Sequence, residues 1–466
     1  MGCNVVARSP REGAEIAAAP GRRNLASFFI SRIYGESTLH SILRDDAARE
    51  NGKMPIIADM SAVQRACNVV LPQMRPKGVN KILLDCPYFR IFVHETIIPM
   101  RHTILLSTLL LLCTVAFAQQ EQKITGVTIN PDNSVTFRYR NPKAVTVEVS
   151  GEFMQGSTQL KEVDGVWTYT TPPLASEMYF YGLTVDGQPI LDLNYSMVKD
   201  IPRWMNYFII GGEKGDLYSV QDVPHGTVAS RWYDSAMLQM RRRVNIYTPP
   251  GYENSKKNYP VFYLLHGNAC DENSWLDLGR AAQVLDNLIA SGKAEPMILV
   301  MTNGNPAQQA APAYFGDTYT NENTRPGIVP FPATFGEIIS FIDSNYRTIR
   351  KKEGRAIAGF SMGGGHAFSI SKDNPNTFAY VGLFSAAGSR LTTPEEKQKL
   401  LDMKKNGCKL YYIGCGTEDF LYRSVLAYNS QLDELGFPYH FRETPGGHTW
   451  GPWRIFLSEM VPMLFK

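Results

Sequence analysis

The stretch RAIAGFSMGGGHAFSI, residues 355–370, constrains the fold of this 466-residue chain more than any other segment. It begins as an apolar strand-like run, ends in residues read as a helix, and places Ser361 in the pentapeptide GFSMG between them. Gly359 and Gly363 stand where a very sharp turn would make any side chain collide with neighbouring strands. The stretch therefore predicts a strand, a tight turn that presents the Ser361 hydroxyl group, and a helix. Gly364 and Gly365 would allow this helix to pack close to the sheet.

From about Val223 the chain alternates between apolar strand-like runs and helical runs. The strand-like runs are VFYLLHG (261–267), MILVMTNG (297–304), RAIAGF (355–360), YVGLFSAA (380–387) and KLYYIGCG (409–416). Alternation of this kind predicts a doubly wound, mostly parallel α/β sheet over residues 223–466. In such sheets the chemistry gathers at the carboxyl ends of the strands.

The preceding segment, residues 119–222, is rich in short strands. SVTFRYR, AVTVEVS, GVWTYTT and EMYFYGLTV are separated by turn sequences such as PDN and VDG. Short strands at this spacing predict a small antiparallel β-sandwich. Its aromatic residues Trp167, Tyr179 and Tyr181 either stack on sugar rings or belong to the core of the sandwich.

An export signal is expected one hundred residues into the chain. From Met100 the sequence has a short basic region, an apolar run and then Ala-Phe-Ala, which is typical of a signal peptide over 100–118 cleaved before Gln119. We therefore expect translation to start at Met100, residues 1–99 to be an over-extended gene start, and the product to be secreted or periplasmic, without stable membrane insertion. The alternative is a cytoplasmic segment followed by a signal anchor.

Composition excludes several classes of protein. The formal net charge of +3 is too small for a nucleic-acid-binding surface. Only Cys270, Cys408 and Cys415 follow Gln119, which is too few for a disulfide framework, and no cysteine and histidine cluster has metal-ligand spacing. We expect neither metal nor cofactor.

Ser361 needs a base and an orienting acid if its hydroxyl group is to act as a nucleophile. In a strand–turn–helix setting of this kind the chain order is serine, acid, histidine. Three histidines follow the serine. His366 lies on the helix and faces away, His440 lies in a strand and is expected to be half-buried and structural, and His448 lies in the loop PGGHTW. His448 is the predicted base.

The acid is expected in the loop IGCGTEDFLY, which offers Glu418 and Asp419. Adjacent side chains diverge, so only one of them can orient the histidine. An oxyanion hole needs two backbone N–H groups. We assign these to Met362, directly after the serine, and to Asn268 in the loop LLHGNACDENSW, where His266 is expected to brace the loop.

Several of these motifs together resemble a known family. YPVFYLLHGNACDENSW, RAIAGFSMGGGHAFSI and GTEDF…GGHTW are similar to the feruloyl esterase domains of bacterial xylanases, in carbohydrate esterase family 1 and the esterase D group of α/β-hydrolases. The resemblance covers about residues 225–466. It implies Ser361 as nucleophile, His448 as base and, as the aspartate that closes a G-T-x-D turn, Asp419 as acid. The sandwich resembles immunoglobulin-like modules related to family 48 carbohydrate-binding modules.

The resemblance implies hydrolysis of esters on plant cell-wall xylan, with a feruloylated or acetylated xylan or oligosaccharide as substrate. Trp275 and Trp450 are candidate substrate-binding residues, with Tyr314 and Trp453 as further candidates. Acetylxylan esterases, siderophore (enterobactin-type) esterases, S-formylglutathione hydrolases and mycolyl transferases share the fold and remain alternatives. A non-enzymatic alternative is a carbohydrate-binding protein built on an inactive hydrolase.

Overall fold

The computed structural model describes residues 81–86, 89–94, 126–200, 203–311, 327 and 329–466. The chain divides into two units, residues 1–114 and 115–466. In the first, strand β1 (Lys81–Cys86) pairs antiparallel with β2 (Phe89–His94). The expected signal peptide and its cleavage before Gln119 lie outside the described residues, as does most of the segment expected to precede the gene start.

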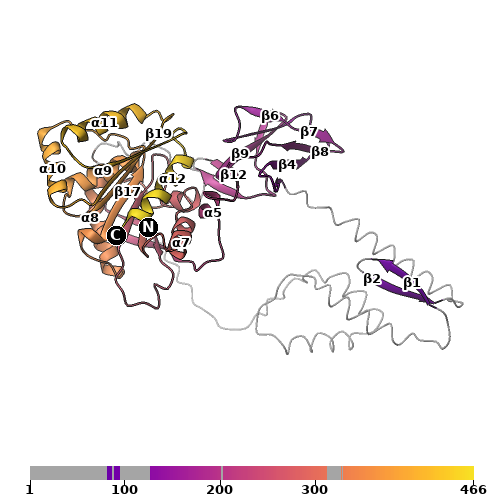
Figure 1. Cartoon of the computed structure of the whole chain (residues 1–466), viewed down its shortest axis with the longest axis horizontal. Helices are drawn as coiled ribbons and strands as arrows, with labels where there is room; N and C mark the ends of the chain where they lie inside the picture. The colour runs from indigo at the N-terminus through magenta and orange to yellow at the C-terminus, as the bar shows by residue number, and fades with distance from the viewer. Residues whose placement is uncertain (1–80, 87–88, 95–125, 201–202, 312–326, 328) are drawn as a thin grey trace, which may run out of the picture. The chain divides into compact units, whose positions relative to one another are not determined.

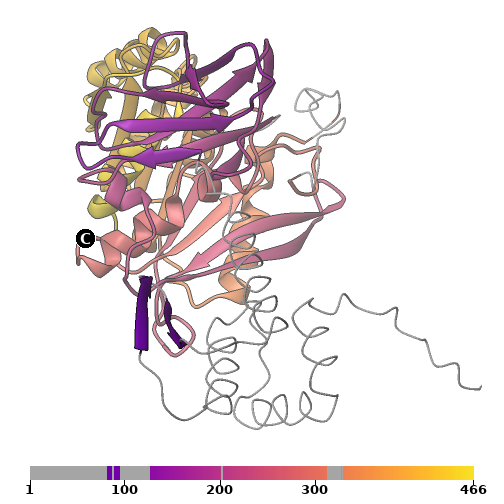
Figure 2. The ribbon, with the colours of Figure 1, turned by 90° about the vertical axis from the view of Figure 1, so that its right-hand side faces the viewer.

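The predicted antiparallel sandwich is confirmed as two sheets (Figure 2). One has the order β11-β12-β9-β5-β6, with β10 also paired to β9, and the other has the order β3-β4-β8-β7. The strands are β3 (Val127–Ile129), β4 (Val135–Arg140), β5 (Val147–Gly151), β6 (Ser157–Gln159), β7 (Lys161–Val163), β8 (Val166–Thr170), β9 (Met178–Val185), β10 (Gln188–Ile190), β11 (Met197–Asp200) and β12 (Arg203–Ile209). Their immunoglobulin-like character stays a prediction.

The core of the sandwich decides the role of two of its aromatic residues. Trp167 and Tyr181 are buried between the sheets with Phe137 and Phe208, so they cannot stack on a sugar ring. Tyr179 packs at the edge of the same cluster and is partly exposed.

The second part of this unit contains the predicted α/β sheet, with eight strands in the order β13-β14-β16-β15-β17-β18-β19-β20. Strands β16 to β20 and β15 pair in parallel, and β13 and β14 are antiparallel at one edge. The strands are β13 (Thr227–Ser235), β14 (Met240–Thr248), β15 (Val261–Leu265), β16 (Ile298–Thr302), β17 (Arg355–Phe360), β18 (Tyr380–Phe384), β19 (Leu410–Gly416) and β20 (His440–Thr444). Strands β15 to β18 are buried almost throughout because helices cover both faces.

Helices form a layer on each face of this sheet (Figure 1). They are α5 (Gly215–Tyr218), α6 (Ser274–Asp277), α7 (Ala281–Ala290), α8 (Phe331–Asn345), α9 (Met362–Asp373), α10 (Pro394–Lys405), α11 (Tyr422–Glu434) and α12 (Trp450–Met460), with short 3-10 turns at Lys352–Gly354 and Val461–Met463. The apolar residues of α6, α7 and α12 pack in one core, and those of α8 to α11 pack in the other. No helix among the described residues is both long and apolar enough to span a bilayer.

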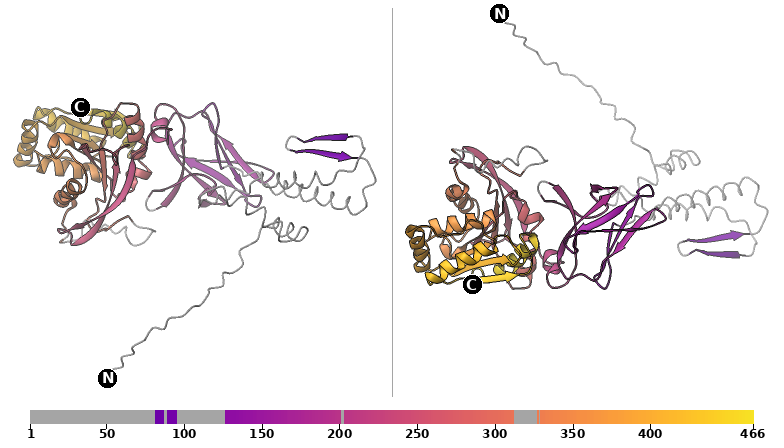
Figure 3. Two further views of the ribbon diagram at one scale, coloured as in Figure 1. Left: turned by 90° about the horizontal axis from the view of Figure 1, so that it is seen from below. Right: turned by 90° about the horizontal axis from the view of Figure 1, so that it is seen from above.

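The sandwich shares a core with the α/β domain. Met178 and Phe180 of β9 are buried in the same apolar cluster as α7 and α12. Arg454 of α12 is fully buried at this junction and donates to Glu177 Oε1 at 3.0 Å and to the Met178 carbonyl at 2.8 Å. The two domains therefore lie directly against each other, as both views of Figure 3 show.

Candidate active site

Ser361 stands on the sharp turn between β17 and α9 that the sequence predicts. Its φ of 54° and ψ of −121° are unfavourable for a residue with a side chain. The turn is held from the neighbouring strand β18, because Ser361 N–H donates to the Phe384 carbonyl at 2.9 Å and Ala387 N–H donates to the Ser361 carbonyl at 2.9 Å. Strained backbone fixed in this way presents the serine side chain at the carboxyl edge of the sheet.

The glycines around Ser361 are required by close backbone contacts. A Cβ atom on Gly359 would lie 2.5 Å from the Gly363 carbonyl, and one on Gly363 would lie 2.4 Å from the His266 carbonyl. A Cβ atom on Gly365 would lie 2.2 Å from the Ala387 carbonyl. Only glycine lets α9 approach the ends of β15 and β18 so closely, as the sequence predicted.

Asp419 and His448 lie together at the same edge. His448 Nδ1 is 2.8 Å from Asp419 Oδ2. Asp419 follows β19 and is buried, whereas its neighbour Glu418 is exposed. Burial by itself would raise the pKa of Asp419, but hydrogen bonds from His448, the Leu421 N–H and Ser385 outweigh it and lower the pKa. The carboxylate is therefore ionised and positioned to orient the imidazole ring.

The two loops that carry this pair extend the pairing of β19 and β20. Thr417 N–H donates to the Thr444 carbonyl at 2.9 Å, and Glu418 N–H donates to the Gly446 carbonyl at 3.1 Å. A Cβ atom on Gly416 would lie 2.2 Å from the Gly446 carbonyl oxygen. The glycines of GCGTED and PGGH thus allow the acid loop and the histidine loop to lie in direct contact.

Aromatic packing connects the histidine loop to the serine turn. The Trp453 ring stacks on Phe360, the residue before Ser361, with 4.0 Å between ring centroids. The same ring meets the His448 ring edge-on at 5.0 Å. Trp453 therefore packs against both the serine turn and the candidate base.

Ser385 belongs to the site, and the sequence analysis missed it. It follows β18, is fully buried and has a φ of 45°. Its hydroxyl group accepts a hydrogen bond from Trp453 Nε1 at 3.2 Å and helps to lower the pKa of Asp419. The sequence did contain an indication of this role, because Ser385 directly follows the buried strand in YVGLFSAA. Residues that follow such strands lie at the carboxyl edge of the sheet, where functional groups gather.

The two candidate oxyanion donors come from adjacent segments. Met362 is the first residue of α9, and the N-terminus of a helix favours negative charge. Asn268 lies in the loop after β15, two residues beyond His266, whose carbonyl nearly touches Gly363. The loop and the helix start are therefore neighbours.

Residues 235–464 match the model of a family described as putative esterases. These residues belong to that esterase family. A relative from Xylanibacter ruminicola, an endo-1,4-beta-xylanase/feruloyl esterase, is 33% identical over an alignment of 356 residues, which covers 72% of this chain and 46% of the relative. Endo-1,4-beta-xylanase Y from Acetivibrio thermocellus is 25% identical over 48% of this chain and 22% of its own length. The chain thus spans less than half of either relative.

A solved structure extends the similarity to the sandwich. The enterobactin esterase from Shigella flexneri, determined with 2,3-dihydroxy-N-benzoyl-serine, is 18% identical, with a TM-score of 0.56 over 74% of this chain and 97% of that one. At this identity the match supports the fold alone. The esterase domain has the predicted α/β-hydrolase fold.

Three other histidines of the esterase domain, His266, His366 and His440, do not have the surroundings of a base. His225 does pair with a carboxylate, at 2.9 Å from Asp286 Oδ2, but it precedes the edge strand β13, whereas Ser361 follows the central strand β17. His266 is buried, accepts from Gly304 N–H through Nε2 at 2.7 Å, and lies 2.7 Å from the Gly267 carbonyl through Nδ1, so it braces two loops as predicted. Burial lowers the pKa of both His266 and His366 to about 4. His440 was expected to be half-buried, but it is exposed on the edge strand β20 and stacks on Tyr412.

The prediction that Trp275 and Trp450 bind substrate is wrong for a packing reason. Trp275 is 1% exposed and Trp450 is 6% exposed, and their rings meet edge-on at 5.4 Å in the core between α6 and α12. Trp275 Nε1 also donates to the Leu265 carbonyl. Trp453 is similarly buried, and Tyr314 lies outside the described residues.

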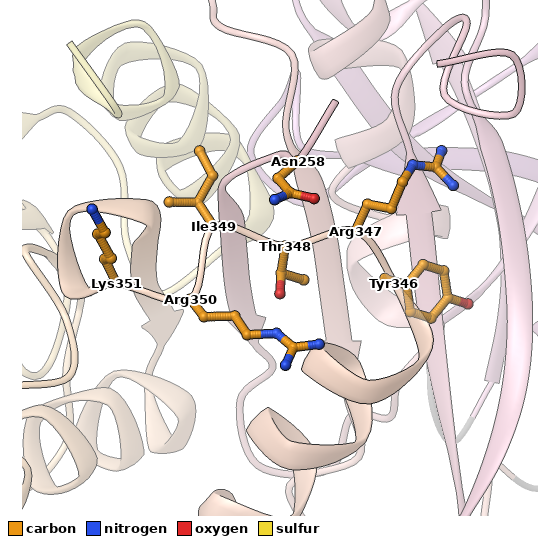
Figure 4. A pocket seen from close by; sticks show the side chains of 7 residues that line it. All are labelled: Asn258, Tyr346, Arg347, Thr348, Ile349, Arg350 and Lys351. Atoms are coloured by element: carbon orange, nitrogen blue, oxygen red, sulfur yellow. The ribbon is translucent and has the colours of Figure 1, made fainter. Parts of the chain in front are cut away.

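A cavity of about 470 Å³ lies away from these residues (Figure 4). It is lined by Asn258 and residues 346–351, near the amino ends of β15 and β17. The charged side chains of Arg347, Arg350 and Lys351 point in different directions in Figure 4, so they do not converge on one ligand. Ser361, Asp419 and His448 follow the carboxyl ends of their strands, at the opposite edge of the sheet.

Proposed function

We propose that this chain is a serine esterase in which Ser361, His448 and Asp419 form the catalytic triad. The observation that carries the proposal is the 2.8 Å contact between His448 and the buried Asp419 carboxylate, at the sheet edge where Ser361 stands on a strained turn. A fixed carboxylate behind an imidazole ring makes the other ring nitrogen available as a base.

The reaction follows from these groups. His448 removes the proton from Ser361 Oγ as the oxygen attacks the ester carbonyl carbon, and the Met362 and Asn268 N–H groups stabilise the oxyanion. The imidazolium then protonates the alcohol oxygen, which leaves, and an acyl-serine remains. Water activated by His448 attacks this intermediate, releases the carboxylic acid and restores the serine.

The proposed substrate is a hydroxycinnamate ester, such as a feruloyl ester, on plant cell-wall xylan. The support is the 33% identity to a protein named as both a xylanase and a feruloyl esterase. The signal-like segment from Met100, with cleavage before Gln119, supports action outside the cytoplasm, where such polymers occur. N-terminal sequencing of the exported protein tests the export step and should begin at Gln119.

The test compares methyl ferulate with p-nitrophenyl acetate at equal concentration, with wild type and Ser361→Ala. We expect faster cleavage of methyl ferulate and loss of both activities in Ser361→Ala. Preference for the acetyl ester would indicate an acetyl esterase instead. Full activity of Ser361→Ala on either ester would refute the proposed nucleophile.

A further inference from the structure

Phe420 is an exposed aromatic residue in contact with the candidate base. It directly follows Asp419, is 75% exposed, and its ring lies 4.5 Å from the His448 ring between centroids, tilted by 47°. An exposed phenyl ring lowers solubility and adds little to folding, because most of its surface stays in water. Nothing in the packing of the domain explains its position.

The backbone fixes Phe420 in place. Asp419 Oδ1 accepts from the Leu421 N–H at 2.8 Å, and the Asp419 carbonyl accepts from the Tyr422 N–H at 2.9 Å. These bonds close a tight turn around Phe420 at the start of α11. One Asp419 oxygen therefore faces His448 while the other holds the turn that presents the phenyl ring.

The contact with His448 determines which part of a substrate Phe420 meets. The imidazole ring must reach the leaving alcohol oxygen to protonate it, so a group packed on that ring lies beside the alcohol part of the ester. Most of the Phe420 side chain is exposed to solvent, where an attached polymer would continue. The apolar face of a sugar ring can stack on an exposed aromatic ring of this kind.

We propose that Phe420 is a specificity residue that binds the sugar from which the acyl group is removed. This inference rests on the proposed function, because it needs His448 to protonate the leaving alcohol. The loop that carries Asp419 and Phe420 would then select the alcohol part of the substrate, and other residues would select the acyl group.

The test measures kcat/KM for two esters of the same acid that differ only in the alcohol. These are methyl ferulate and a feruloylated arabinoxylan oligosaccharide, or, if wild type prefers acetate, methyl acetate and an acetylated xylo-oligosaccharide. In Phe420→Ala we expect the ratio of the sugar ester to the methyl ester to fall about tenfold, and Phe420→Trp should restore it. Trp232→Ala, which removes another exposed aromatic residue, is the matched control and should leave the ratio unchanged.

An unchanged ratio in Phe420→Ala would overturn the inference. So would an equal loss on both esters, which would mean that the ring only shields His448. Failure of the proposed function has a different signature, because wild type would then cleave neither ester or Ser361→Ala would stay active. Melting temperatures establish that each variant is folded.

Discussion

Two of the buried charged pairs in the described part of the chain differ in what their burial achieves. Arg454 and Glu177 join the esterase domain to the sandwich, and Asp419 and His448 lie at the carboxyl edge of the sheet. Arg454 is 0% exposed and is held on a helix, with bonds from Nε and Nη2 to Glu177 and from Nη1 to the Leu278 carbonyl. Its guanidinium group thus has a partner at each nitrogen and is closed to any ligand.

The pair at the sheet edge is built differently. Both residues lie in loops, and the His448 side chain remains 19% exposed. The Asp419 carboxylate is fully enclosed, while the imidazole ring of His448 stays partly accessible to solvent. Every nitrogen of the Arg454 guanidinium group has a hydrogen-bond partner, so this pair joins the two domains. In the other pair the carboxylate is enclosed and the imidazole ring is partly exposed, so a substrate can reach the ring. Substitutions in the Asp419–His448 pair should therefore lower activity, and substitutions in the Arg454–Glu177 pair should lower stability.

The largest effect is expected from Asp419→Asn. The amide cannot stabilise the imidazolium and favours the wrong tautomer, so kcat should fall on the order of 10⁴-fold. Glu418→Gln, which changes the exposed neighbour, should keep wild-type kcat. Steady-state kinetics on methyl ferulate with both variants decides between the two carboxylates, and the opposite pattern would assign the acid to Glu418.

The next effect concerns stability. Glu177→Ala leaves the buried Arg454 charge without its carboxylate, which costs about 3–5 kcal/mol of unfolding free energy. Urea denaturation measures this loss, and Glu213→Ala, at an exposed carboxylate, is the control. The kcat of the folded fraction should not change. A stability loss no greater than that of the control would show that the junction contributes little.

A smaller effect on activity is expected from Ser385→Gly. Glycine accepts the φ of 45° but removes the hydroxyl group that helps to keep Asp419 ionised, so kcat should fall on the order of tenfold with little change in KM. Ser385→Ala removes the same hydroxyl group and should match this kcat loss, but with a lower melting temperature. A wild-type kcat in Ser385→Gly would mean that the hydroxyl group of Ser385 does not contribute to catalysis, and that only its backbone conformation matters.

The smallest effect is a pH dependence of stability. The pKa of Asp419 is lowered in the folded state, so its contribution to stability is fully present above the unfolded pKa of about 3.9 and is lost as pH falls. The stability difference between wild type and Asp419→Asn should thus narrow below about pH 4. Chemical denaturation at pH 7 and near pH 3 tests this, and a difference that widens in acid would contradict the assigned direction.

Local sequence patterns were sufficient to predict the elements around the site. The alternating apolar runs predicted the parallel sheet, and the spacing of glycines around Ser361 predicted a turn where a Cβ atom would collide with backbone. These features depend on neighbours along the chain, so the order of residues is enough to determine them. The proximity of Asp419 and His448 also followed, because consecutive parallel strands end at the same edge.

Tertiary packing decided what the patterns left open. Trp275 and Trp450 were expected at a substrate surface, yet they are buried. The prediction failed because the local sequence around an aromatic residue in a loop or a terminal helix does not show whether the side chain faces water or the core. The roles proposed for Ser385 and Phe420 depend on partners distant along the chain, Trp453 and His448. The sequence determined which strands and turns form, and the three-dimensional contacts determined which side chains are enclosed and which remain open to a substrate, since burial depends on residues far apart in the chain.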